Sequence, residues 1–220
     1  MNGQGQLVIT AKRISNEYAE QVSNEPGVED ILNRCWECQF TSSRIKTSRK
    51  VSFQYGRIEA RMQLPSGIGT WPAFWMLGGD LLDGVPWPEC GEIDIMEYRG
   101  DYSDRITSVL HGPTTPPGSG IGSAYLHFEP LSGDFHKYAI EWKKDEITFY
   151  VDDRPHGVVR KNDWSGGRWV YNQKFFIILN LAMGGTYAGE YIDPYLEKAE
   201  LKVDYIRFYS INGVGRVFNS

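Results

Sequence analysis

The stretch Gly56–Leu64 reads GRIEARMQL, and its side chains alternate in polarity along its whole length. The even-numbered positions from Ile58 to Leu64 are apolar, and the odd-numbered positions from Arg57 to Gln63 are polar. Because successive side chains of a β-strand point to opposite faces, this pattern predicts a strand with one face against a core and the other in water.

Similar runs recur along the chain between turns rich in glycine, proline, aspartate and asparagine. The segment Phe175–Leu181 is apolar except for Asn180, which predicts an inner strand covered on both faces. Gly27–Asn33 is a weak helix candidate. About ten short strands with almost no helical periodicity predict an all-β fold, a β-jelly-roll sandwich of two curved antiparallel sheets. The other strand-like runs are Gln6–Ala11, Phe40–Thr47, Arg105–His111, His136–Lys143, Glu146–Val151 and Leu201–Tyr209.

We expect a single domain over residues 1–220. No internal repeat, linker or low-complexity tract divides the chain, and 220 residues are enough to bury a substantial core.

The charge and hydropathy of the chain argue against several classes of partner. The formal net charge is −5 and there is no basic run, which argues against nucleic acid and anionic membrane surfaces. No stretch reaches the ~20 apolar residues of a membrane span, and Met1–Gln4 does not resemble the start of a signal peptide. Aromatic residues make up 14% of the chain, so some of these rings are expected to face solvent or ligand.

The three cysteines cannot all pair within the chain. Cys35 and Cys38 form a CxxC motif, but neither a second cysteine pair nor a nearby histidine pair completes a zinc site. A disulfide between Cys90 and one of these two, and a fully reduced chain, both remain open.

The segment Gly91–Tyr98, GEIDIMEY, carries three acids in a strand-like apolar run. Burying unpaired carboxylates in a core is costly, so we expect them to line a cleft. Simple alternation places Glu92 and Asp94 on one face and Glu97 on the other. A β-bulge at Ile95-Met96 resets the alternation and brings all three acids to one face.

Three acids on one face repel one another and raise at least one pKa, which a general acid near neutral pH requires. A retaining glycosidase uses one carboxylate as nucleophile and another as acid/base, separated by ~5 Å. The alternative is an edge strand protected by its charges.

Motifs over nearly the whole chain resemble glycoside hydrolase family 16, in particular its laminarinase-like members. The catalytic strand of these members has the pattern E-x-D-x-x-E, matched here by Glu92–Glu97. The other matching motifs are TSSRIKTSRK (Thr41–Lys50), YGRIEARMQLP (Tyr55–Pro65), GTWPAFWML (Gly69–Leu77), LHGP (Leu110–Pro113), FHKYAIEW (Phe135–Trp142), NLAMGG (Asn180–Gly185) and VDYIRFY (Val203–Tyr209).

The resemblance implies a jelly-roll with an open cleft across its concave sheet. It also implies endo-hydrolysis of β-1,3-glucan, or of mixed-linkage β-1,3-1,4-glucan, with retention and without a catalytic cofactor. Glu92 would be the nucleophile, Asp94 the assisting acid and Glu97 the acid/base. The extra residue in the motif favours the laminarinase, agarase and carrageenase branch, and WPAFWML favours laminarinase. By resemblance we expect an extracellular protein.

Family members usually carry a longer segment before the equivalent of Gly5–Thr10, and we expect this N-terminal strand region to be missing. Many relatives also bind a structural calcium ion. By position, the carbonyl of Gly5 and the carboxylate of Asp204 would be two of its ligands, while a third usually comes from the missing segment. A hard cation needs several oxygen ligands, so calcium is predicted here with an incomplete set.

Three tryptophans are predicted to bind substrate. Trp71 and Trp75 are four residues apart and share a strand face, where flat aromatic rings would stack on sugars. Trp87 precedes the catalytic strand in a proline-flanked loop. The alternative for all three is ordinary core packing.

Four polar residues complete the predicted substrate site. His111 would hydrogen-bond the substrate or one of the acids, although a lone strand histidine is more often structural. Arg44 and Arg49 bracket a strand that in the family borders the donor side of the cleft, and surface solvation is their alternative. Asn180 needs a partner if it is buried, and sugar or backbone would serve equally.

Two rival functions are compatible with parts of this pattern. A glucan-recognition module would keep the fold and lose the glutamates, whereas both are present here. An enzyme acting on agarose or carrageenan is the second rival, but a sulfated polymer favours a basic cleft and this chain is acidic. The expected partner is therefore a β-glucan polysaccharide, bound by a monomer.

Overall fold

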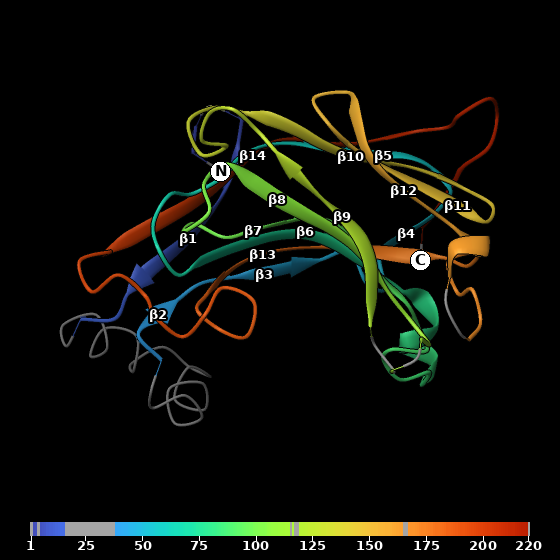
Figure 1. Cartoon of the computed structure of the whole chain (residues 1–220), viewed down its shortest axis with the longest axis horizontal. Helices are drawn as coiled ribbons and strands as arrows, with labels where there is room; N and C mark the ends of the chain where they lie inside the picture. Colours follow the sequence, from blue (N-terminus) through green and yellow to red (C-terminus); the bar gives the residue numbers. More distant parts are fainter. Residues whose placement is uncertain are drawn as a thin grey trace.

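The predicted alternating stretch forms strand β5 (Gly56–Gln63), with Ile58, Ala60 and Met62 fully buried. It belongs to one of two antiparallel sheets that face each other in a sandwich (Figure 1). The computed structural model describes residues 2, 3, 5–15, 38–114, 116, 119–164 and 167–219. Because nearly every element within this part is a strand of one of the two sheets, the predicted all-β sandwich is confirmed.

The first sheet has the strand order β12-β11-β10-β5-β14-β1-β2. Besides β5, its strands are β1 (Leu7–Arg13), β2 (Phe40–Thr41), β10 (His136–Lys143), β11 (Glu146–Val151), β12 (Arg154–Arg160) and β14 (Lys198–Tyr209).

The second sheet has the order β15-β4-β13-β6-β7-β8-β9, with β3 paired to β13. Figure 1 shows β6, β7 and β8 as long, curved neighbours in this layer. The strands of this sheet are β3 (Arg44–Lys46), β4 (Val51–Gln54), β6 (Thr70–Gly78), β7 (Glu92–Tyr98), β8 (Arg105–His111), β9 (Gly120–Leu126), β13 (Phe175–Met183) and β15 (Arg216–Asn219).

Two short 3₁₀ helices, η1 (Gly79–Asp83) and η2 (Lys161–Asp163), complete the elements. Among the described residues, no helix is both long enough and apolar enough to cross a membrane. The helix predicted at Gly27–Asn33 lies outside the described residues.

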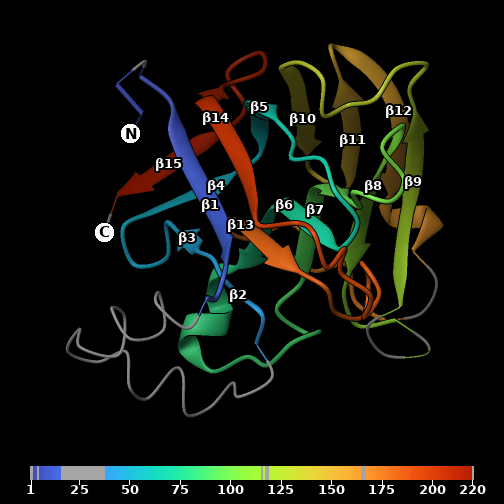
Figure 2. The same cartoon turned by 90° about the vertical axis from the view of Figure 1, so that its left-hand side faces the viewer.

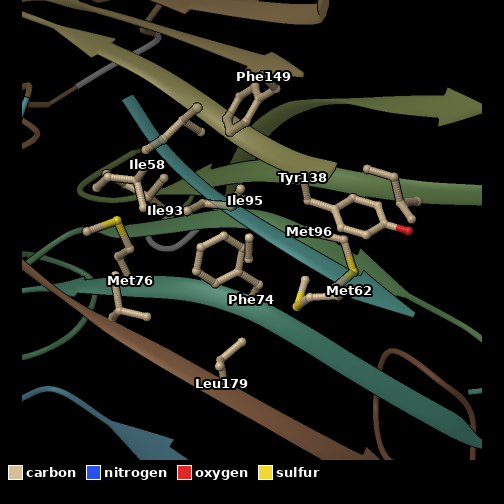
Figure 3. Packing of buried hydrophobic residues seen from close by; sticks show 14 of the residues in the cluster. Ile58, Met62, Phe74, Met76, Ile93, Ile95, Met96, Tyr138, Phe149 and Leu179 are labelled. Atoms are coloured by element: carbon tan, nitrogen blue, oxygen red, sulfur yellow. The ribbon is translucent and has the colours of Figure 1, made fainter. Parts of the chain in front are cut away.

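The core lies between the sheets, where Ile58 and Met62 of β5 meet Phe74 of β6 and Ile93 of β7 (Figure 3). Full burial of one such side chain stabilises the fold by about 1.5–3 kcal/mol. The opposite face of β6 and β7 is therefore free to carry polar and aromatic side chains, and this second face positions the site.

The prediction of one strand over Phe40–Thr47 is wrong. Residues 40–41 form β2, which pairs with β1 in the first sheet, and residues 44–46 form β3, which pairs with β13 in the second. Ser42 and Ser43 carry the chain from one sheet to the other. The polarity pattern of residues 40–47 cannot reveal this change of sheet, because both parts of the segment have strand character and differ only in the strands they pair with.

Cys90 is a free, fully buried cysteine, so a disulfide at Cys90 is excluded. Cys38 takes part in a disulfide, which also excludes a fully reduced chain. Cys35 lies outside the described residues.

Candidate active site

The predicted bulge is present in β7 at Ile95-Met96. On the β6 side, Asp94 pairs with Trp75 and Met96 with Phe74, so Ile95 is passed over. On the β8 side the register shifts between Asp94 and Glu97. One extra residue resets the alternation, and Glu92, Asp94 and Glu97 all line one cavity.

That cavity has a volume of about 160 Å³ and opens on the face of the second sheet that points away from the core. Four of the strands of this sheet, β3, β6, β7 and β13, contribute to it. Its lining residues are Arg44, Trp71, Ala73, Trp75, Glu92, Asp94, Glu97, Asn180 and Ala182.

Glu92 begins β7 and accepts a hydrogen bond at Oε2 from the indole N–H of Trp87, at 2.7 Å. The ring of Trp87 is about half exposed, in the loop before β7. Gly91, which immediately precedes Glu92, has φ +78°, a conformation that glycine adopts without strain. This turn aims Glu92 into the cavity beside an indole.

Asp94 is the buried acid, with only 3% of its surface exposed. Its pKa is raised well above the usual value, first by burial, then by the charges of Glu92 and Glu97 and by a hydrogen bond with Glu92. His111 Nε2 lies 3.4 Å from Asp94 Oδ2. The raised pKa favours a neutral Asp94 that donates its proton to a neighbouring carboxylate.

Glu97 accepts a hydrogen bond at Oε1 from the indole N–H of Trp71, at 3.1 Å. Burial raises the pKa of Glu97, while the hydrogen bond from Trp71 and the charge of His111 act in the opposite direction. The predicted upward pKa shift within the acid cluster is therefore found at two of its members. A carboxyl with a raised pKa is suited to donate a proton near neutral pH.

Trp75 and Asn180 are diagonal neighbours in the β6–β13 pair, where Asn180 lies opposite Ala73. The indole N–H of Trp75 donates to Asn180 Oδ1 at 2.7 Å, so the partner of this buried amide oxygen is an indole. Arg44 lies over the Trp75 ring, at 5.4 Å from its centroid. Together these three side chains form one wall of the cavity.

The sequence profile described as "Glycosyl hydrolases family 16" matches residues 3–207. The chain belongs to glycosyl hydrolases family 16. The family predicted from the motifs is therefore confirmed.

Named relatives of this family 16 chain include a "Beta-glucanase" from Rhodothermus marinus, 39% identical over 180 residues, or 78% of this chain and 63% of the relative. A "Glucan endo-1,3-beta-glucosidase" from Cryptopygus antarcticus is 37% identical over 79% of this chain and 68% of the relative. The chain thus spans less than two thirds of the Rhodothermus protein's length.

Among solved structures, the laminarinase catalytic domain from Thermotoga maritima matches this family 16 chain with a TM-score of 0.78 and 37% identity. The match covers 94% of this chain and 78% of that one. The jelly-roll predicted for this chain agrees with that likeness.

Arg49 does not line the cavity that holds Glu92, Asp94 and Glu97. It lies in the turn between β3 and β4, with φ +58°, and lines a separate cavity of about 830 Å³ with Lys174 of the loop before β13 and Leu82 of η1. Arg44 points into the acid cavity because residue 44 lies opposite Asn180 in the β3–β13 pair. The two arginines predicted as a pair therefore occupy different places.

Sequence reasoning missed Tyr187, whose ring lies 5.2 Å from that of Trp71. Its hydroxyl is 2.6 Å from Thr107 Oγ1 of β8, and burial raises its pKa to about 12. Tyr187 follows the Gly184-Gly185 turn, and an aromatic residue after a glycine pair was the signal available in the sequence. It extends the aromatic wall beside Glu97.

The surroundings of Asp204 do not fit a calcium site by themselves. One oxygen of Asp204 lies 2.8 Å from Arg61 Nη1 in an ion pair. In the described part of the chain, no three side chains of the His, Cys, Asp and Glu types cluster so as to hold a metal ion. Calcium takes six to eight oxygen ligands, more than Asp204 and the carbonyl of Gly5 supply, so this ion stays a prediction.

Proposed function

We propose that this chain cleaves internal β-1,3 bonds of a glucan by a retaining double displacement. The observation that carries the proposal is the bulge in β7, since it brings Glu92, Asp94 and Glu97 into one cavity. Glycoside hydrolysis requires a pair of carboxyl groups that flank the scissile bond.

In the first step, Glu92 attacks the anomeric carbon while Glu97 gives its proton to the departing glycosidic oxygen. The raised pKa of Glu97 supports the acid role, because burial keeps its proton in place. The products of this step are a glycosyl ester on Glu92 and the shortened chain. In the second step, Glu97 takes a proton from the water that hydrolyses the ester.

Asp94 is proposed to be neutral and to donate a hydrogen bond to the Glu92 carboxylate. This hydrogen bond breaks as the ester forms and forms again on hydrolysis. The raised pKa of Asp94 and its hydrogen bond with Glu92 support this role. Trp87 holds the other side of Glu92 through its indole N–H. The nucleophile is thus fixed between two donors before the sugar arrives.

The wall of Trp71, Trp75, Arg44 and Asn180 is proposed to bind the sugar rings. Pyranose faces are apolar and stack on flat aromatic side chains, while a guanidinium and an amide donate to hydroxyl groups. The names of the relatives, "Glucan endo-1,3-beta-glucosidase" and laminarinase, support β-1,3-glucan as substrate. Mixed-linkage glucan is the second candidate, since another relative is named "Endo-1,3-1,4-beta-glycanase EglC".

We also propose that the chain acts as a monomer outside the cell. The three acids lie on a single strand, so one chain supplies every proposed catalytic carboxyl. A polymeric substrate is encountered outside the cell unless it is first imported.

The test is a panel of laminarin, lichenan, agarose and xyloglucan, with release of reducing ends as the readout. We expect laminarin to be cleaved fastest and Glu92→Gln to remove the activity. NMR of the first product should show the β anomer, as retention requires. Inactivity of the unmodified chain on all four polymers, or a first product with the α anomer, would contradict the proposal.

A further inference from the structure

The bulge that assembles the acids leaves Ile95 without a residue opposite it in β6, and on the β8 side the pair Ile95-Met96 lies against the single residue Ser108. Its carbonyl oxygen accepts a hydrogen bond from the hydroxyl of Ser108, at 2.8 Å. Ser108 lies in β8 beside the bulge and is fully buried. An unpaired buried carbonyl is costly, so this hydroxyl stabilises the bulged form of β7.

Behind Ser108 lies His156, a side chain that comes from the other sheet. Its Nε2 is 3.4 Å from Ser108 Oγ, a long contact, and its Nδ1 is 3.0 Å from Ser123 Oγ of β9. β12, which carries His156, lies beside β9 where the edges of the two sheets meet (Figure 2). The imidazole therefore links two serines of the second sheet to the first.

His156 reaches this position through a second bulge. In the β11–β12 pair, Phe149 lies opposite Gly157 and Tyr150 opposite Pro155, so His156 is the extra residue. Gly157 is required beside it, because a Cβ at this position would lie 2.0 Å from Ser123 Oγ. Two bulges and one close approach thus serve to bring these side chains together.

The directions of the hydrogen bonds follow from the number of available protons. The single proton of the Ser108 hydroxyl goes to the Ile95 carbonyl, so Ser108 Oγ accepts from Nε2–H of His156. A neutral imidazole then accepts at Nδ1 from the hydroxyl of Ser123. Burial lowers the pKa of His156 to about 4, which agrees with one proton on the ring.

We propose that Ser108 and His156 are positioning residues for Glu97. The chain of contacts from Ser123 through His156 and Ser108 to the Ile95 carbonyl holds β7 in its bulged form. A regular strand at this point would turn Glu97 away from Glu92. Ser108 and His156 therefore affect catalysis through the position of Glu97, without contacting the substrate. This inference rests on the proposed function, because it assigns the effect to the acid/base role of Glu97.

The experiment compares Ser108→Ala with the unmodified chain on laminarin and on 2,4-dinitrophenyl β-laminaribioside. Dinitrophenolate leaves without protonation, so kcat/KM for the aryl glycoside does not require Glu97 as an acid. We expect kcat/KM to fall about 10- to 100-fold on laminarin, as for a catalytic group displaced by about 1 Å, with little loss on the aryl glycoside. General damage to the fold would reduce both substrates equally.

Ser52→Ala is the matched control, because Ser52 of β4 is half-buried in the same sheet and lines a different cavity. It should leave the ratio of the two kcat/KM values unchanged. If Ser108→Ala does not fold, His156→Phe tests the same contacts by removing the partner of Ser108. This variant should also lower the ratio of kcat/KM on laminarin to kcat/KM on the aryl glycoside.

An unchanged ratio in the folded variant would overturn the positioning role while leaving the proposed function intact. A failure of the unmodified chain on both substrates would instead overturn the proposed function. The two failures are therefore distinguishable in one experiment.

Discussion

Trp71 and Glu97 are joined by a hydrogen bond of 3.1 Å between the indole N–H and Oε1. This bond lowers the pKa of Glu97 while burial raises it. Trp71→Phe removes the lowering contribution, so the pKa of Glu97 should rise and the basic limb of the kcat/KM profile should move to higher pH.

Trp75→Phe is the control for this shift, because the indole N–H of Trp75 donates to Asn180 and not to a carboxylate. Its basic limb should stay in place. Equal shifts in the two variants would show that loss of an indole, rather than of the bond to Glu97, moves the profile.

Asp94 should make stability depend on pH, because its pKa is higher in the fold than in the unfolded chain. The native state then binds more protons than the unfolded state above about pH 3.9, and stability falls as pH rises toward the folded pKa. Asp94→Asn removes this loss. We expect the variant to gain stability relative to the unmodified chain as the pH rises above about 3.9, by about 1.4 kcal/mol for each pH unit up to the folded pKa.

The measurement is Tm at several pH values, with the exposed Asp83→Asn as control. That control should show a constant difference from the unmodified chain. A constant difference for Asp94→Asn as well would mean that Asp94 does not hold its proton more tightly in the fold.

Arg44 and Arg49 should differ in their effect on substrate binding. Arg44 lines the acid cavity over the Trp75 ring, whereas Arg49 lines a separate cavity. Arg44→Gln should raise KM for laminarin about three- to tenfold, as expected for the loss of roughly 1 kcal/mol of hydrogen bonding and cation–π contact. Arg49→Gln should leave KM unchanged. Initial-rate kinetics on laminarin measure KM for both variants. An equal rise in KM would show that both arginines contribute to substrate binding.

Gly91 should be needed for stability as well as for aiming Glu92. Its φ is +78°, and an added Cβ would lie 2.7 Å from Val170 Cγ2. Gly84 has φ +93° with open space around it, so Gly84→Ala isolates the backbone strain. We expect a loss of about 1–2 kcal/mol for Gly84→Ala and about 3 kcal/mol for Gly91→Ala in urea unfolding. Equal losses would show that the clash with Val170 relaxes freely.

Much of the fold follows from local patterns. The predicted runs Arg105–His111, His136–Lys143 and Glu146–Val151 coincide with β8, β10 and β11. These strands are amphipathic, and a period of two residues is visible without knowledge of any partner. The bulge in β7 was also predictable, because three acids in an apolar run share a face only if the alternation is interrupted once.

The exceptions depend on partners that are remote in the sequence. Phe40–Thr47 divides between the sheets because β1 and β13 pair with its two halves. Tyr187 joins the site because Thr107 and Trp71 meet it in space. His156 has no motif of its own, and only the contact between β12 and β9 brings it behind the bulge.

The order of residues alone therefore determined most of the strands, the sandwich and the three acids of the catalytic strand, since each of these follows from local polarity and spacing. Tertiary structure decided which side chains surround those acids: it separated Arg49 from Arg44, joined Trp71 to Glu97 and placed Ser108 against the Ile95 carbonyl. The physical reason is that hydrogen bonds and burial act over a few ångströms, and strands far apart in the chain come that close only after the sheets have formed.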